Sequence, residues 1–123
     1  MKSIVLISGI WNLLLGLGLI FQELLADHTI AENYFNLMIG AFLLFTASVL
    51  VIASRNLQKN ASFVLWEAFL RFSAAAILLT IGQKVIGNNA IFIGLTDILW
   101  GLSYIIGLPM ALKKSFGTIL FDQ

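Results

Sequence analysis

Glu67, Arg71 and Asp97 are ionisable residues that lie inside long apolar stretches of the sequence. Glu67 and Arg71 are four residues apart, so a helix presents both on one face, with the glutamate on the favourable N-terminal side. A charge at the centre of a membrane costs about 2.5–3.5 kcal/mol, and an arginine that binds two carboxylates offsets much of that cost. The sequence therefore predicts that these three side chains form one charged cluster.

Three interpretations of the charged cluster stay open at this point. It could be a structural clamp that fixes the register of two helices, a polar pocket for a ligand head group or a proton, or a site completed by another subunit. Two carboxylates face a single guanidinium in it. A protonated carboxylate or a bound cation would balance that excess of negative charge.

Asn12, Trp100 and Tyr104 are further candidates for this polar core. At a rise of about 1.5 Å per residue, Asn12 lies about 12 Å below one face of the membrane, at the level of Glu67. Trp100 and Tyr104 flank Asp97 on its helix. Buried Trp and Tyr side chains usually find a hydrogen-bond partner, and Asp97 is a reasonable one. Packing alone is the alternative role for both aromatic residues.

The composition indicates a membrane protein. Of the 123 residues, 60% are hydrophobic and 11% are charged, and the mean hydropathy is +1.01. A soluble domain carries about 25% charged residues, so this chain cannot cover a globular surface with polar groups. The net charge of +1 and the absence of any Lys/Arg cluster argue against nucleic-acid binding. Without cysteine there are no disulfides or thiolate metal sites.

Four apolar runs of about 20 residues follow one another, each long enough for a helix to cross about 30 Å of hydrocarbon. Their expected bounds are 3–25, 33–54, 61–82 and 89–112. Backbone groups must bond internally in lipid, and no alternation typical of barrel strands is present, so the runs are expected to be helices. A cleaved signal peptide is the alternative for the first run, but that run is too long for one and three more follow. The expected fold is a single all-α membrane domain, 1–123.

The connections between the runs are short, which predicts an antiparallel up-down four-helix bundle. Asn60 or Ser62 is expected to cap the third helix, a glycine of the 82–89 connection to end it, and Asn88 or Asn89 to cap the fourth. Pro109 is expected to kink or end the fourth helix. One side of the bundle holds Lys2, Arg55, Lys59, Lys113 and Lys114, and the other holds Lys84 with Glu23, Asp27 and Glu32. The positive-inside rule then places both termini in the cytoplasm.

The expected depths of Arg71 and Asp97 in the membrane support the prediction that they belong to one charged cluster. If the third helix enters the membrane at Ala61, Arg71 lies about 15 Å deep, and Asp97 lies about 12 Å from the opposite face, where the fourth helix enters near Asn89. In a hydrocarbon core of about 30 Å the two side chains then differ little in height. Arg71 is therefore expected to reach both Glu67 and Asp97.

Each run carries a stripe of small or polar residues at helical spacing, which is expected to face inward while large aliphatic residues face lipid. The stripes are Val5, Ser8, Asn12, Gly16, Leu19 and Glu23; Leu37, Gly40, Leu44, Ala47, Val51 and Ser54; Phe63, Glu67, Arg71, Ala74 and Leu78; and Ala90, Gly94, Asp97, Gly101, Tyr104 and Leu108. Trp66, near a membrane boundary, is expected to be an interfacial anchor.

No set of residues predicts catalysis. His28, with Glu23, Asp27 and Glu32, could be imagined as a metal site, but a single histidine in a short acidic loop is more often simply solvated. No nucleophile and base can be paired, because this histidine is the only one in the chain. The protein is therefore expected to be non-enzymatic, with no cofactor and no metal.

The chain resembles small, mostly uncharacterised bacterial four-helix membrane proteins of a DoxX-like type. The resemblance rests on Trp11-Asn12 and Gly16, the basic loop after Ser54, and the run Thr96-Asp97-Ile98-Leu99-Trp100. It implies a four-helix bundle and carries no residue-level redox site over to this chain. The length is also similar to that of small multidrug transporters, but their first-helix glutamate has no match here, since Glu23 lies at the outer end of its helix.

The expected function is that of a multi-pass cell-membrane protein that binds a partner membrane protein or a lipophilic small ligand around the charged cluster. The alternative is a proton-coupled transporter or channel, in which Glu67 or Asp97 changes protonation and which acts as a homo-oligomer. Four helices alone leave little room for a pore, so a channel would need more than one copy.

Overall fold

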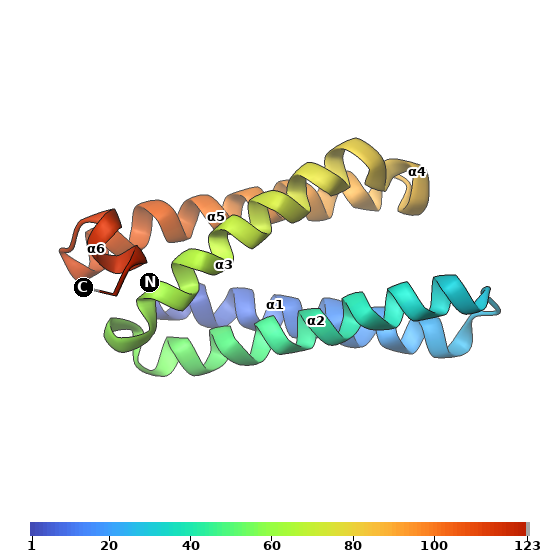
Figure 1. Ribbon diagram of the computed structural model, residues 1–123, viewed down its shortest axis with the longest axis horizontal. Coiled ribbons are helices and arrows are strands. Elements are labelled where there is room, and N and C mark those ends of the chain that lie inside the picture. The colour runs from blue at the N-terminus through green and yellow to red at the C-terminus, as the bar shows by residue number, and fades with distance from the viewer. Residues whose placement is uncertain (123) are drawn as a thin grey trace. The chain divides into compact units, whose positions relative to one another are not determined.

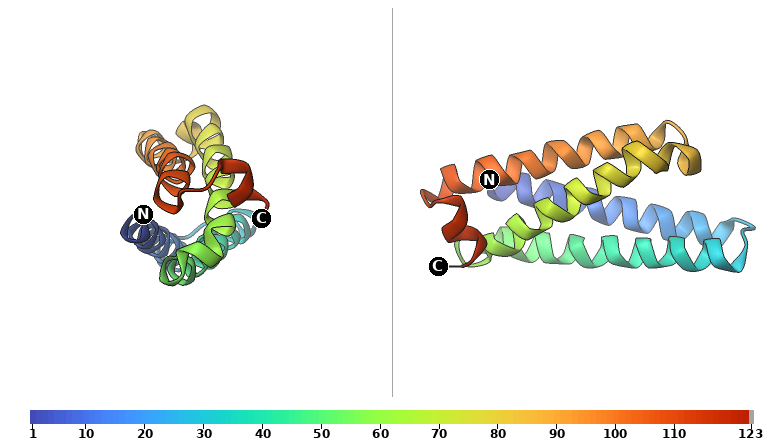
Figure 2. Two further views of the ribbon diagram at one scale, coloured as in Figure 1. Left: turned by 90° about the vertical axis from the view of Figure 1, so that its left-hand side faces the viewer. Right: turned by 45° about the horizontal axis from the view of Figure 1, so that its top comes forward.

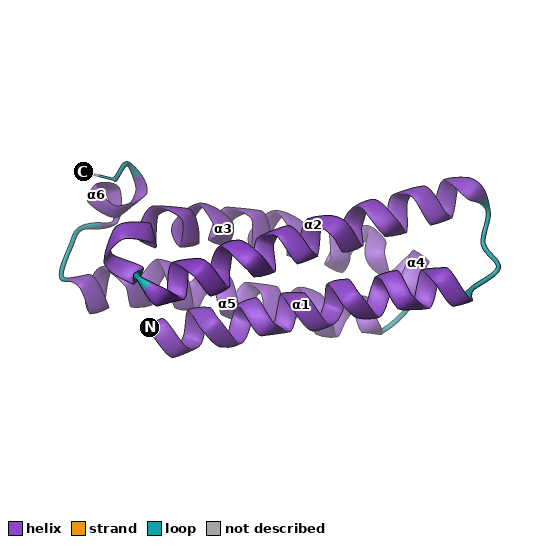
Figure 3. Cartoon of the chain, turned by 90° about the horizontal axis from the view of Figure 1, so that it is seen from below, coloured by secondary structure: helices purple, strands orange, loops and turns teal. Residues whose placement is uncertain are grey.

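The structure is a computed structural model that describes residues 1–122, and this part of the chain contains only helices and their connections (Figures 1 and 3). In chain order the elements are α1 (Lys2–Leu25), α2 (Ile30–Arg55), α3 (Leu57–Ile77), the π-helical segment η1 (Leu78–Gly82), α4 (Gln83–Ile86), α5 (Asn89–Leu112) and α6 (Phe116–Leu120). The predicted domain 1–123 also includes Gln123, which lies outside the described residues.

Four helical stretches are long and apolar enough to cross a membrane. They are Lys2–Leu25, Ile30–Arg55, Leu57–Ile86 and Asn89–Leu112. The all-helical fold and the number of span-length helices predicted from the sequence are therefore confirmed. The first and last stretches agree with prediction to within one residue, and the two middle ones are longer than predicted.

Both middle stretches begin early because of capping residues. Thr29 and Glu32 form a reciprocal capping box, in which each backbone N–H donates to the other residue's side-chain oxygen, at 3.1 and 3.3 Å. This starts α2 at Ile30. Asn56 caps α3 by accepting from the backbone N–H of Lys59 at 3.3 Å. The predicted caps at residues 60 and 62 are therefore wrong by about one turn.

Gly82 does not end the third stretch. The helical path widens into η1, continues through α4, and stops at Gly87, whose φ of 66° and ψ of −146° suit only glycine. Asn88 is the N-cap residue of α5, as predicted, but it makes no side-chain capping bond. α4 (Gln83–Ile86) therefore extends the third stretch beyond the predicted boundary at residue 82.

The chain divides into two compact units, Lys2–Arg55 and Asn56–Gln123 together with Met1. In the first, α1 and α2 pack side by side along a helical hairpin (Figure 1). Gly16 and Gly40 let the backbones approach closely: a Cβ on Gly16 would stand 3.0 Å from the carbonyl oxygen of Gly40. Such small residues are the usual means of close approach between apolar helices.

In the second unit, α3 and η1 pack against α5, and α6 folds back beside the start of α3 (Figure 2). The ring of Phe72 packs against Gly101 of α5. A Cβ added to Gly101 would lie 2.8 Å from that ring. Pro109 lies inside α5 and does not end it. The helix ends at Leu112, and Lys113 adopts a left-handed conformation with its N–H bonded to the carbonyl of Pro109.

The predicted stripes describe the burial of α5 best, and that of α3 least well. The residues buried in α5 are Ala90, Gly94, Asp97, Gly101, Tyr104 and Leu108, the same six as predicted. In α1, Val5, Ser8, Asn12, Gly16 and Glu23 are buried as predicted. In α3 the prediction that Phe63 faces inward is wrong, because this residue is 61% exposed. In α2 the stripe missed Thr46, Leu50 and Ala53, which are buried.

Candidate functional site

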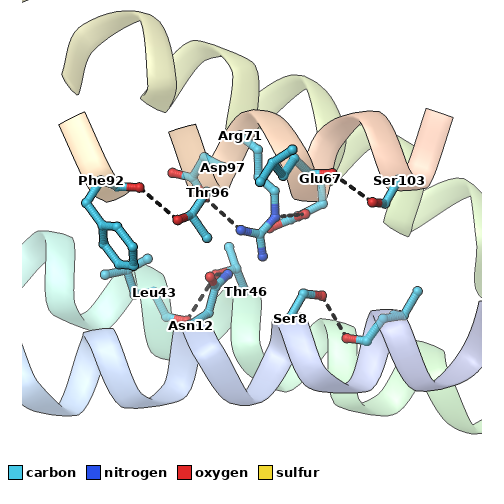
Figure 4. A network of polar contacts seen from close by, with 12 residues as sticks. Ser8, Asn12, Leu43, Thr46, Glu67, Arg71, Phe92, Thr96, Asp97 and Ser103 are labelled. Carbon is cyan, nitrogen blue, oxygen red and sulfur yellow. Dashed lines mark hydrogen bonds and ion pairs between the residues drawn. The ribbon is translucent and has the colours of Figure 1, made fainter. Parts of the chain in front are cut away.

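α3 and α5 bring the three side chains of the charged cluster into direct contact. Arg71 Nε donates to Glu67 Oε2 at 2.8 Å, and Arg71 Nη1 donates to Asp97 Oδ1 at 2.7 Å. Figure 4 shows the guanidinium lying between the two carboxylates, one from its own helix and one from α5. The predicted contacts of Arg71 with Glu67 and Asp97 are therefore confirmed.

The charged cluster is largely removed from solvent. The exposed fractions of the side chains are 3% for Arg71, 6% for Glu67 and 12% for Asp97. At such burial both bonds are charge-assisted contacts in surroundings of low polarity, where each is stronger than on a surface. Losing one partner would leave a buried charge without compensation.

The two helices present Arg71 and Asp97 at the same height. Arg71 lies about 21 Å along the helix from Leu57, and Asp97 lies about 22 Å back from Leu112, at about 1.5 Å per residue. Because α3 begins at Leu57 and not at residue 61, Arg71 lies further from the start of its helix than predicted. Its distance from that end still matches the distance of Asp97 from Leu112, because α5 runs antiparallel to α3. The ion pair thus links the middle of one helix to the middle of the next.

Tyr104 lies beside the guanidinium of Arg71 in the same unit. Its side chain is fully buried, and its ring centroid lies 5.7 Å from Arg71 Cζ. That distance is within the range of a cation–π interaction. The structure therefore places Tyr104 beside Arg71, where the sequence had associated it with Asp97.

Trp100 does not make the predicted hydrogen bond to Asp97. Its indole Nε1 is buried and has no hydrogen-bond partner among residues 1–122. Asp97 instead accepts from the guanidinium, which is a stronger donor than a neutral indole. Of the sequence-predicted neighbours of Asp97 on α5, Trp100 is the one that stays outside the bonded network.

Asn12 bonds across the other hairpin. Its Nδ2 donates to Thr46 Oγ1 at 3.0 Å, and the Thr46 hydroxyl donates to the carbonyl of Leu43 at 3.0 Å (Figure 4). This is a buried polar link between α1 and α2. The stripe assigned to the second run did not contain Thr46. The place of Asn12 in one polar core with Glu67 stays a prediction.

A second polar cluster, which the sequence did not predict, joins Glu23, His28 and Asn36 at the closed end of the α1–α2 hairpin. Glu23 is only 4% exposed. Its Oε1 lies 2.9 Å from His28 Nδ1, and its Oε2 accepts from Asn36 Nδ2 at 2.8 Å. The Glu23 hydrogen bond raises the pKa of His28, with smaller contributions from the charges of Glu23, Glu32 and Asp27.

This second polar cluster corrects the interpretation of His28 as simply solvated, because the ring is paired with the buried Glu23. The five-residue spacing of Glu23 and His28 across the end of α1 could have indicated their contact. Predicting that contact would have required the path of the chain after Leu25. Among the described residues, no group of three or more His, Cys, Asp or Glu side chains is arranged to hold a metal ion.

Comparison of the chain with protein-family models, with curated proteins and with solved structures finds no match. What can be said of function therefore rests on the chain's own geometry. That geometry is four helices of membrane-spanning length and a buried Glu–Arg–Asp cluster linking α3 to α5.

Proposed function

We propose that this chain is a non-enzymatic, multi-pass protein of the cell membrane that binds a lipophilic ligand or a partner membrane protein at the charged cluster. The observation that carries the proposal is the pairing of one guanidinium with two buried carboxylates, at 2.8 and 2.7 Å. Ionisable groups inside membrane helices are rare, and they commonly mark ligand or ion sites.

The charge count indicates what kind of group the site would take. Arg71 supplies one positive charge against two carboxylates, so the fully ionised cluster carries an excess negative charge. A buried excess charge is costly unless it is compensated. A ligand amine, or a Lys or Arg side chain on a partner helix, would supply that compensation. The occupant we propose is therefore lipophilic or helical, with one cationic group.

The test is native mass spectrometry of the protein released from lipid nanodiscs. The wild type should retain a lipophilic cation or a co-purifying membrane protein, and Asp97→Asn should reduce its occupancy at least tenfold, because the excess charge is gone. Ser103→Ala is the matched control on the same helix, since among residues 1–122 its hydroxyl bonds only the carbonyl of Leu99. Equal retention in Asp97→Asn and wild type would overturn the proposal.

A second candidate function rests on the same imbalance of charge. A proton, rather than a ligand cation, could neutralise Asp97 or Glu67, and a protein that exchanges it would be a proton-coupled transporter or an oligomeric channel. Proton flux in liposomes that disappears in Asp97→Asn and persists in Ser103→Ala would favour this candidate. Absence of flux in the wild type would exclude it.

We also propose the topology: the four stretches form one antiparallel up-down bundle with both termini in the cytoplasm. The distribution of Lys and Arg supports this orientation. The chain has no cysteine, so single cysteines can report sidedness. Gly117→Cys should react with an impermeant maleimide only from the cytoplasmic side and Ala26→Cys only from outside. The reverse pattern would refute the orientation.

A further inference from the structure

α6 is held across one end of the second unit by hydrogen bonds to its final carbonyl. Ser62 Oγ and Trp66 Nε1, both on α3, donate to the carbonyl oxygen of Leu120 at 2.9 and 3.2 Å. Ser115 caps the helix by accepting from Thr118 N–H, and Ile119 is buried. The right-hand view of Figure 2 shows α6 beside the start of α3, at the end of α5. The short helix is therefore a fixed part of this end.

Three lysines lie on the segments next to α6 and form no ion pair with a carboxylate within residues 1–122. Lys59 lies in the first turn of α3, and Lys113 and Lys114 form the turn between α5 and α6. All three are exposed, and none takes part in an ion pair within residues 1–122. Asp122 is the one acidic residue near α6 in the described chain, so positive charge predominates at this end.

Exposed aromatic rings accompany these lysines. The exposed fractions are 53% for Trp66, 36% for Phe116 and 67% for Phe121. Phe116 packs edge-on against Phe69, with ring centroids 6.4 Å apart. Aromatic rings beside lysines at the ends of span-length helices are typical of the boundary between hydrocarbon and headgroups. The end of the second unit around α6 thus carries both exposed lysines and rings suited to that boundary.

The hollow beneath α6 is too small to hold a headgroup. Its volume is about 10 Å³, and Gln58, Ser62 and Lys114 are among its lining residues. Such a volume admits one water at most. A phosphate can therefore reach the lysine side chains only from outside, which is how a lipid at the membrane boundary would approach.

We propose that α6, with Lys59, Lys113 and Lys114, is a binding site for the phosphate of an anionic phospholipid in the leaflet at this end. The lysines contact the headgroup, and Phe116 and Phe121 contact the acyl region beside it. The site is separate from the charged cluster, and it rests on the proposed function only in requiring that the chain spans a membrane.

The experiment measures lipid preference by native mass spectrometry in mixed micelles of phosphatidylglycerol and phosphatidylcholine. Each lysine near an anionic surface contributes about a fivefold change in binding. Lys113→Gln combined with Lys114→Gln should therefore lower the phosphatidylglycerol preference by about twenty-fivefold. Lys84→Gln, on exposed α4 at the opposite end of the unit, is the matched control and should leave the preference unchanged.

A site-specific probe reports on α6 itself. Gly117 has no atom within 4 Å of an added Cβ, so Gly117→Cys can carry an environment-sensitive fluorophore without disturbing packing. Its emission should shift to the blue as phosphatidylglycerol replaces phosphatidylcholine, and less so in the double lysine variant. Inorganic phosphate should not produce the shift, which distinguishes a lipid from a free anion.

Equal binding of the two lipids by the wild type would overturn the proposal, as would an equal loss in Lys84→Gln and in the double variant. The melting temperatures of the variants establish that each is folded. Asp97→Asn should keep the full phosphatidylglycerol preference. Failure of the proposed function at the charged cluster is then distinguishable from failure of the lipid site.

Discussion

Replacing Arg71 with alanine tests whether the charged cluster holds α3 against α5. The variant removes hydrogen bonds of 2.8 and 2.7 Å and leaves two carboxylates buried. Two bonds to charged groups, at about 1.5–3 kcal/mol each, amount to about 3–6 kcal/mol. Removing one side of a buried ion pair costs about 3–5 kcal/mol, which is the same range. The loss expected from Arg71→Ala is thus about 4 kcal/mol.

The assay is thermal unfolding of the purified protein in detergent, followed by circular dichroism. A loss of this size should lower the melting temperature by on the order of 10 °C. Arg71→Lys should fall between wild type and alanine, because an ammonium keeps the charge but lacks the planar fork that binds two carboxylates. Ser73→Ala is the matched control, since its exposed hydroxyl bonds, in the described part of the chain, only the carbonyl of Phe69 on its own helix.

A melting temperature for Arg71→Ala equal to that of Ser73→Ala would refute the clamp and leave the site as a binding pocket only. A second variant separates charge from packing. Neutralising all three residues, as Glu67→Gln, Arg71→Gln and Asp97→Asn together, should recover part of the lost stability, because no unpaired charge stays buried. If this triple variant is no more stable than Arg71→Ala, unpaired charge is not the cause.

Two further predictions concern the α1–α2 hairpin. Gly16→Val should destabilise the protein by several degrees in the same assay, because its Cβ meets the Gly40 carbonyl at 3.0 Å, whereas Gly18→Val, with nothing within 4 Å, should not; equal effects would show that close approach at Gly16 does not matter. The Glu23 hydrogen bond raises the pKa of His28 in the folded protein. The stability that protonated His28 contributes to the fold is therefore complete below its pKa in the unfolded chain, about 6.5, and is lost as the pH rises through its higher pKa in the folded protein. The melting temperature should therefore fall from about pH 6 to pH 8 in wild type but not in His28→Gln; parallel slopes in the two proteins would contradict this.

Apolar periodicity was sufficient to predict the buried face of α5. Gly94, Asp97 and Gly101 recur at helical spacing among large aliphatic residues, so the stripe is unambiguous. On α3 the third stripe began at Phe63, one residue away from the buried Val64. Of the predicted stripe, only Glu67 and Arg71 are among the buried residues of α3.

Helix ends were predicted less well than helix faces. The capping box of Thr29 and Glu32 was present in the sequence as T-x-x-E and could have been recognised. Asn56 was harder, because Asn60 offers an equally good capping residue one turn later. Local chemistry permitted both, and the extra turn of α3 decides between them in the structure.

The position of α6 and the second polar cluster, formed by Glu23, His28 and Asn36, could not be predicted from the sequence. A helix of five residues has no periodicity, and its fixed place depends on Ser62 and Trp66, which are more than fifty residues away from Leu120 in the chain. Likewise, Glu23 meets Asn36 only because the hairpin closes between them. In both cases the contact is tertiary, and local propensity carries no information about it.

The π-helical segment has a consequence for how this chain should be aligned with any relative. A π turn holds one residue more per hydrogen-bonded ring than an α turn, so it absorbs an extra residue while the helix on either side keeps its phase. Gly82 still faces Ala90, and Gly94 still receives Leu79. A sequence with one residue fewer between Leu78 and Gly82 would restore continuous α-helical bonding and leave Arg71 and Gly87 in place. A single-residue gap at this point in an alignment would therefore record a conserved structure rather than a different one.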